Sequence, residues 1–224
     1  MTGLTPKEVE ALHQAFSAVY ATEYPSDKTA TGRGRKRQSG GGRKGQLPTT
    51  EQKLLFSLVY QKTYPLQALL GEVFGLSQSR ANRWIQRLLP ILKQALDELG
   101  VLPSRAPEDF AEQERNRQET AALIIDGTDR RRQRPKNQAK QALHYSGKQK
   151  THSDKNVVVV NAKTKRVGYL SQTYAGKMPD KKIVDTEPLR YPRGTILYQD
   201  TGFQGYAPKV QQTHQPKKSR ARAR

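Results

Sequence analysis

Apolar residues recur at intervals of three or four along the first hundred positions, and this spacing predicts helices. The first helix is predicted to start at Thr5–Glu8, where Thr5 is placed to cap the helix and Glu8 to complete a capping box. Its apolar positions are Val9, Leu12, Phe16, Val19 and Tyr20. A second start of the same kind lies at Thr49–Gln52, and further helices are predicted up to residue 102. Pro90 is expected to kink or divide the last of them.

A short turn at Gly75–Ser77 separates two of these helices, and Ser77 is placed to cap the second. Two helices around such a turn are typical of a helix-turn-helix, although any three-helix bundle could give a similar pattern. The second helix would present polar side chains able to reach DNA bases and phosphates. These are Gln78, Ser79, Asn82, Arg83, Gln86 and Arg87. Trp84 is predicted to belong to the core.

The period changes from helical to strand-like after residue 120. Strands are predicted at residues 121–125, 156–161, 167–170 and 195–198, and a helix at 179–189. The first three strands, a helix and then another strand predict a mixed α/β sheet. The predicted organisation is an N-terminal helix (1–27), a basic flexible linker (28–48), a helix-turn-helix DNA-binding domain (49–102), a second linker (103–120), the sheet domain (121–208) and a basic disordered tail (209–224).

The charge of the chain points to a polyanionic partner. Its 224 residues include 40 Lys and Arg against 20 Asp and Glu, for a formal net charge of +20. No apolar run approaches the ~20 residues that a membrane span needs, so double-stranded DNA is favoured over a membrane. The absence of cysteine excludes disulfides, cysteine-ligated zinc and thiol catalysis. We expect a soluble, intracellular protein of the bacterial type, associated with the nucleoid.

Two apolar runs each end on one carboxylate: residues 123–125 precede Asp126, and residues 196–199 precede Asp200. If the two strands are adjacent, these carboxylates converge and need a shared cation, for which Mg²⁺ or Mn²⁺ is well suited. Arginine could also supply the positive charge. Taken singly, each aspartate is better explained by a turn or a strand-end cap, because Asp-Gly and Asp-Thr-Gly are ordinary turn sequences. For the pair, periodicity alone is equally compatible with a turn role and with a metal site.

Basic residues follow Asp126 without an intervening run of acids, and they could contact the DNA strand that is cut. The alternative is a solvated surface. The predicted DNA contacts in this part of the chain are Arg130, Arg131, Arg132, Arg134, Lys148 and Lys150. For the basic linker, phosphate contact and a simple tether are equally compatible with the sequence.

Several motifs in order over residues 121–208 resemble the DDE transposases of the insertion-sequence-five type, and the helix-turn-helix ahead of them resembles the DNA-binding domain of that family. The motifs are Asp126–Asp129, Gln133–Pro135, Tyr145–Lys150, Pro179–Lys182 and Asp200–Gly205. The resemblance implies an α+β protein, with an all-α helix-turn-helix domain followed by an incomplete ribonuclease-H-like α/β domain. It implies that Asp126 and Asp200 are catalytic and bind the divalent metal ions. It leaves Asp180 structural.

The resemblance further implies binding to terminal inverted repeats, hydrolysis that frees a 3′ hydroxyl, attack of that hydroxyl on target DNA, and a homodimer or larger assembly on the transposon ends. Family members carry a third ligand, a glutamate, beyond the second aspartate. Here no acid follows Asp200, so we expect a truncated gene or the first frame of a frameshifted element, with little catalysis by this chain alone. The alternatives are a non-enzymatic repressor or inhibitor that binds DNA and, less favoured, an RNA-binding protein.

Overall fold

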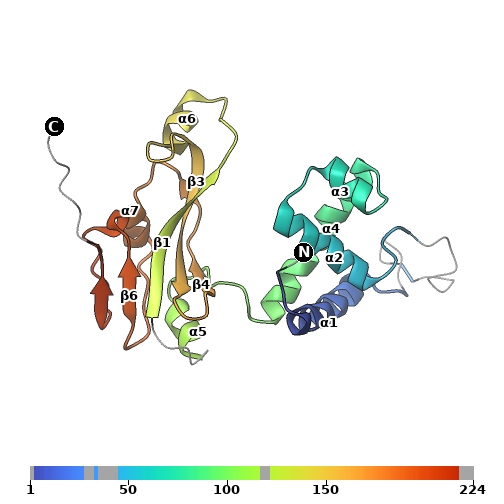
Figure 1. Cartoon of the computed structure of the whole chain (residues 1–224), viewed down its shortest axis with the longest axis horizontal. Coiled ribbons are helices and arrows are strands. Elements are labelled where there is room, and N and C mark those ends of the chain that lie inside the picture. The colour runs from blue at the N-terminus through green and yellow to red at the C-terminus, as the bar shows by residue number, and fades with distance from the viewer. Residues whose placement is uncertain (1–2, 28–32, 35–44, 117–121, 217–224) are drawn as a thin grey trace. The chain divides into compact units, whose positions relative to one another are not determined.

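Residues 3–27, 33–34, 45–116 and 122–216 are described by the structure, a computed structural model. The chain forms two compact units, residues 1–102 and residues 103–224, and each has its own hydrophobic core (Figure 1). Most of the basic linker expected at 28–48 lies outside the described residues, as does the end of the expected tail from residue 217 onward.

The first unit is helical. Its elements are α1 (Pro6–Glu23), α2 (Thr50–Thr63), α3 (Gln67–Val73) and α4 (Gln78–Glu98). The capping box at the start of α1 is confirmed, because the Thr5 hydroxyl accepts from the Glu8 amide and the Glu8 carboxylate accepts from the Thr5 amide. Leu12 and Phe16 of α1 pack in the same core as Leu54 of α2 and Leu88 of α4. The N-terminal helix is therefore part of the helix-turn-helix unit.

The turn between α3 and α4 has the geometry that the sequence predicts. The Leu76 amide donates to the Gly71 carbonyl at 2.7 Å, and Gly75 has a φ of +65°. A Cβ atom at Gly71 would lie 2.5 Å from the Leu76 carbonyl oxygen, so only glycine permits this close approach. Ser77 is the N-cap residue of α4. Contrary to one expectation, Pro90 does not divide α4, which continues to Glu98.

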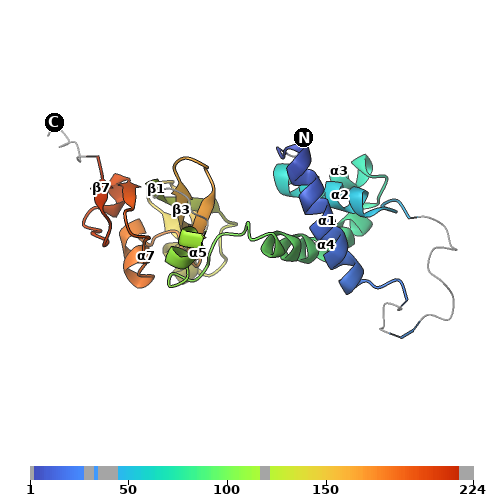
Figure 2. The same ribbon diagram turned by 90° about the horizontal axis from the view of Figure 1, so that it is seen from below.

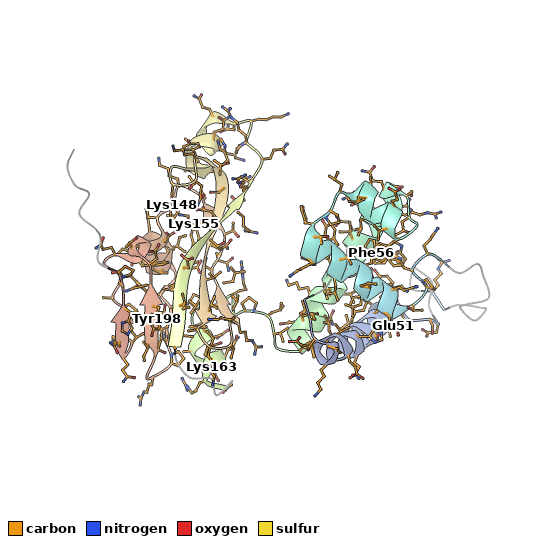
Figure 3. All side chains as sticks on the ribbon, in the orientation of Figure 1. Glu51, Phe56, Lys148, Lys155, Lys163 and Tyr198 are labelled. Atoms are coloured by element: carbon orange, nitrogen blue, oxygen red, sulfur yellow. The ribbon has the colours of Figure 1, made fainter. Side chains whose placement is uncertain are left out.

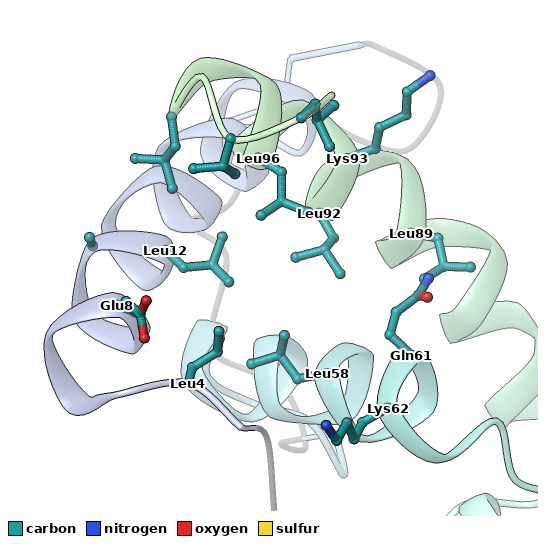
Figure 4. A pocket seen from close by; sticks show the side chains of 14 residues that line it. Leu4, Glu8, Leu12, Leu58, Gln61, Lys62, Leu89, Leu92, Lys93 and Leu96 are labelled. Carbon is teal, nitrogen blue, oxygen red and sulfur yellow. The ribbon is translucent and has the colours of Figure 1, made fainter. Parts of the chain in front are cut away.

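The apolar residues in and beside α3 are only partly buried. Leu70 lies in the core, but Leu66, Leu69 and Val73 are exposed. The helical unit also contains an apolar pocket lined by α1, α2 and α4, into which Leu12, Leu58, Leu92 and Leu96 project (Figure 4). None of the carboxylates predicted to bind metal lies in this pocket.

The second unit contains a mixed sheet and short helices. The helical elements are α5 (Phe110–Asn116), α6 (Gln138–His144), α7 (Asp180–Thr186) and the 3-10 turn η1 (Thr201–Phe203). The strands are β1 (Ala122–Arg131), β2 (Tyr145–Ser146), β3 (Thr151–Asn161), β4 (Val167–Leu170), β5 (Tyr174–Ala175), β6 (Ile196–Gln199) and β7 (Gln212–His214).

The sheet has the order β2-β3-β1-β6-β7, and β4 and β5 also pair with β3. The β1–β3 and β3–β4 pairs are antiparallel, whereas β1–β6 and β6–β7 are parallel. The expected α+β class, a helical helix-turn-helix region followed by a mixed α/β domain, is confirmed. Residues 162–166 connect β3 to β4 in a hairpin, with Lys165 at a φ of +61°.

The two faces of the sheet differ in what covers them. Leu123 and Ile125 of β1 and Leu197 of β6 point to the buried face, where they pack with residues of α5 and α7. Figure 2 shows both helices on one side of the strands. Because side chains alternate along a strand, Ile124 and Tyr198 point to the opposite face, where they are 36% and 43% exposed. We call this second side the open face.

Two predicted boundaries differ from the structure. The linker expected at 103–120 contributes to the sheet unit: Phe110 of α5 is fully buried against the rings of Tyr169 and Tyr191, and Ser104 pairs with β4. The basic tail expected to be disordered from residue 209 includes β7, which extends the sheet beyond β6. Both segments are polar in sequence, and contacts with distant strands determine their structure.

Candidate active site

The strand register brings the two predicted catalytic aspartates together. The last pair in the parallel β1–β6 ladder is Ile125 opposite Gln199, and Asp126 and Asp200 are the next residue on each strand. Both side chains are exposed on the open face of the sheet. They line one pocket with residues of β1, β6, β7 and the two positions after β7: Ile124, Ile125, Tyr198, Gln199, His214, Gln215 and Pro216. Two aspartates that are 74 positions apart in sequence thus share one site.

The position of Asp126 corrects the expectation that it lies at a strand end. β1 continues to Arg131, because its antiparallel partner β3 pairs with it as far as Ser153. Only the pairing with β6 stops at Ile125. Asp126 therefore lies at the point where β1 separates from β6, whereas Asp200 directly follows β6 and caps η1.

Each aspartate is oriented by a neighbouring backbone amide. The Gly127 amide donates to Asp126 Oδ1 at 2.7 Å, and the Thr201 amide donates to Asp200 Oδ1 at 2.6 Å. Within the described residues, neither carboxylate forms an ion pair with Lys, Arg or His. The alternative in which arginine neutralises them is therefore not observed there. Two exposed carboxylates that pair with no cation in the described part of the chain are a donor set that suits a hard divalent ion.

In the described part of the chain, no group of three or more potential metal ligands is present. Counted over the described residues, the candidate centre consists of two carboxylates, Asp126 and Asp200. Sequence reasoning gave no role to His214, whose ring stacks on Tyr198 at 4.9 Å between centroids beside Asp200. The polar sequence of β7 contains no pattern that would have placed it at this site.

The predicted DNA contacts of the sheet unit fall into two groups. Arg130 donates to Asn156 and Thr173, Arg132 contacts Asp154 and His144, and Arg134 donates twice to Gln141. These three guanidinium groups thus also stabilise the sheet unit through hydrogen bonds and an ion pair. The second group is exposed, with no partner among the described side chains, and Figure 3 labels one member, Lys148. The group comprises Arg131, Lys148 and Lys150.

The polar face predicted for α4 is largely confirmed as exposed. Gln78, Ser79 and Arg83 are exposed, whereas Asn82 is half-buried and accepts from Gln67 at 3.2 Å. Arg87 lies over the rings of Tyr24 and Trp84, at 5.0 and 5.4 Å from their centroids. Its guanidinium therefore helps to attach α1 to α4.

A buried glutamate fixes the chain just after α7. Glu187 accepts hydrogen bonds from the hydroxyls of Tyr169 and Tyr174 and from the Gln172 amide. Burial and the hydrogen bond to Glu187 raise the pKa of Tyr174 to about 12, and the same causes raise the pKa of Tyr169 further. The network connects α7, whose first residue lies beneath the candidate site, to β4 and β5.

Comparison with known families agrees with this geometry. Residues 45–98 match a family model described as the helix-turn-helix of DDE superfamily endonuclease, and residues 125–223 match one described as DDE superfamily endonuclease. The chain is similar to DDE superfamily endonucleases in both units. No curated protein and no solved structure matched it. Within the described ranges, no helix is both long and apolar enough to cross a membrane.

Proposed function

We propose that the protein is a transposase-type DNA endonuclease and strand transferase that binds the terminal inverted repeats of a mobile element. The observation that carries this proposal is the β1–β6 register, which sets Asp126 and Asp200 side by side on the open face of the sheet. A strongly basic chain with paired carboxylates is suited to chemistry on a nucleic-acid backbone. The insertion-sequence-five type and the association with the nucleoid are part of the proposal.

Asp126 and Asp200 would hold Mg²⁺ or Mn²⁺, since each has carboxylate oxygen available on the solvent side. When bound, such ions activate water or a hydroxyl group and stabilise the leaving oxygen in phosphodiester chemistry. The amides of Gly127 and Thr201 would keep both carboxylates oriented.

DNA would contact both units. In the helical unit, α4 would enter the major groove with Gln78, Ser79 and Arg83 toward the bases. In the sheet unit, Arg131, Lys148 and Lys150 would contact phosphates. Replacing these three by glutamine should lower the slope of log affinity against log salt concentration by about 1 for each phosphate contact removed. A homodimer, or a larger assembly on two element ends, would bring two such sites to the DNA.

The test compares Asp126→Asn and Asp200→Asn with a matched control, Asp185→Asn, which removes an exposed carboxylate from α7. Nicking of an inverted-repeat duplex is measured with Mg²⁺ and with Mn²⁺, and DNA binding is measured in parallel. We expect only weak nicking by the unaltered chain, because the described residues bring no third carboxylate to the site. The two site variants should lose that nicking and bind DNA with unchanged affinity, whereas the control keeps both. Measurable nicking by Asp126→Asn at the rate of the unaltered chain would refute the proposal.

The second candidate function is a DNA-binding repressor without catalysis. It is favoured by the two-carboxylate centre, because the described residues bring no third ligand to the site. Inverted-repeat binding with no nicking by the unaltered chain, in either metal, would support this function over the first.

A further inference from the structure

A buried ion pair lies beneath the candidate active site, on the covered face of the sheet. Lys155 Nζ of β3 lies 3.0 Å from Asp180 Oδ1, the carboxylate of the first residue of α7. The two side chains are only 10% and 16% exposed. Among the described residues, this oxygen accepts no hydrogen bond of good geometry, so the contact is chiefly ionic. Figure 3 labels Lys155 on the sheet.

The Asp180 carboxylate is pressed against the two backbone segments that carry the catalytic aspartates. A Cβ atom at Gly127 would lie 2.5 Å from Asp180 Oδ1, and one at Gly202 would lie 2.8 Å from Asp180 Oδ2. Neither glycine has a positive φ, so backbone conformation does not require glycine at these positions. The close approach of the carboxylate does.

The contacts of Asp180 with Gly127 and Gly202 reach the backbone segments whose amides orient the two aspartates. Gly127 supplies the amide that holds Asp126 Oδ1, and Gly202 follows Thr201, whose amide holds Asp200 Oδ1. Moving either backbone segment would move an amide and the carboxylate that it orients. One carboxylate beneath the sheet thus contacts both halves of a site on the other face.

Filling this space with an ion pair is unfavourable in free energy. Taking two charges out of water costs free energy that their attraction often fails to repay, and an apolar pair of similar volume frequently stabilises a protein as well or better. The oxygen atoms of a carboxylate are, however, smaller than the methyl groups of leucine, so a carboxylate can lie closer to the backbone of Gly127 and Gly202. Lys155 also fixes the direction of the carboxylate from the neighbouring strand.

We infer that the Lys155–Asp180 ion pair is a positioning device that sets the separation of the Asp126 and Asp200 backbones, and with it the affinity of the site for a divalent ion. The metal-binding part of this inference rests on the proposed function. Asp180 is a positioning residue, since it lies on the opposite face of the sheet from the carboxylates that it places.

The test uses the full chain with Lys155→Met and Asp180→Leu combined, so that no charge is left buried alone. Asp185→Asn, on the same helix, is the control. Two quantities are measured besides the melting temperature: Mn²⁺ affinity by titration calorimetry, and hydrogen exchange of the Gly127 and Thr201 amides by NMR without metal. We expect the double variant to stay folded and to melt in one cooperative transition, with Mn²⁺ affinity lowered about 10- to 100-fold and exchange of both amides at least about tenfold faster.

The two readouts separate the inference from the proposed function. Faster amide exchange in a chain whose unaltered form binds no Mn²⁺ would uphold the positioning role and refute the metal site. Unaltered exchange at both amides in the folded double variant would overturn the inference, whatever the nicking assay shows. If the double variant does not fold, Gly127→Ala replaces it, because the added methyl group displaces the Asp180 carboxylate from the other side. We expect this variant to give faster exchange of the Thr201 amide. Unaltered exchange of that amide would equally overturn the inference.

Discussion

Truncation of Phe110 to alanine should destabilise the sheet unit alone. The side chain is fully buried and lies 5.8 Å from the Tyr169 ring and 6.0 Å from the Tyr191 ring, by centroids. Its removal leaves a cavity between α5 and β4, and Phe→Ala changes at such sites cost about 3–5 kcal/mol. That loss is a large part of the ~5–15 kcal/mol by which a domain is usually stable.

Hydrogen exchange with mass spectrometry would measure this effect in each unit of the same sample. Amides of β1 and β3 that exchange through global opening should exchange about a hundredfold to a few thousandfold faster in Phe110→Ala. Amides of α4 should be unchanged. The fluorescence of Trp84, the chain's single tryptophan, reports the helical unit independently. Leu143→Ala is the matched control, because this leucine of α6 is 55% exposed.

Two results would refute the reasoning. If β1 and β3 exchanged at the unaltered rate, Phe110 would not belong to the core of the sheet unit, and residues 103–120 would be the linker that the sequence predicts. If α4 accelerated as much as β1, the two units would unfold together, and their separate cores would not act independently.

Three further outcomes are expected. Gly71→Ala should destabilise the helical unit by about 1–3 kcal/mol, since the added methyl meets the Leu76 carbonyl oxygen at 2.5 Å; urea unfolding followed by tryptophan fluorescence measures this, and an unchanged midpoint would contradict the turn geometry. The sheet unit should lose stability as the pH rises from about 10, where an unfolded tyrosine ionises, to about 12, the raised pKa of Tyr174. In this range the unfolded chain holds fewer protons than the folded one, so rising pH favours unfolding. Glu187→Gln should lower the stability of this unit at neutral pH and make its further loss at high pH smaller, and hydrogen exchange of β3 measured against pH tests both. Thr5→Ala should cost the helical unit about 1 kcal/mol through loss of the α1 cap, and no change in its melting temperature would show that the cap contributes nothing.

Short-range patterns in the sequence determined much of the secondary structure of this protein. Thr5 and Thr49 both cap helices as predicted, although the reciprocal bond of a capping box is present at Thr5 and not at Thr49. These caps, the turn at Gly75 and the exposed polar side of α4 follow from neighbours a few positions apart, because helix caps and turns are satisfied within one or two turns of chain. The carboxylates at Asp126 and Asp200 were also found by sequence, since an acid after an apolar run breaks the burial pattern of a strand.

Tertiary structure decided what depends on distant partners. Phe110 belongs to a core and residues 212–214 form a strand only because β4 and β6 offer surfaces for them. Asp126 lies inside β1 because β3 continues to pair beyond the end of β6. Lys155 and Asp180, which no pattern in the sequence pairs, meet beneath the site through the packing of α7 on β3. Burial and strand register are properties of pairs of segments, so a single segment's composition does not specify them.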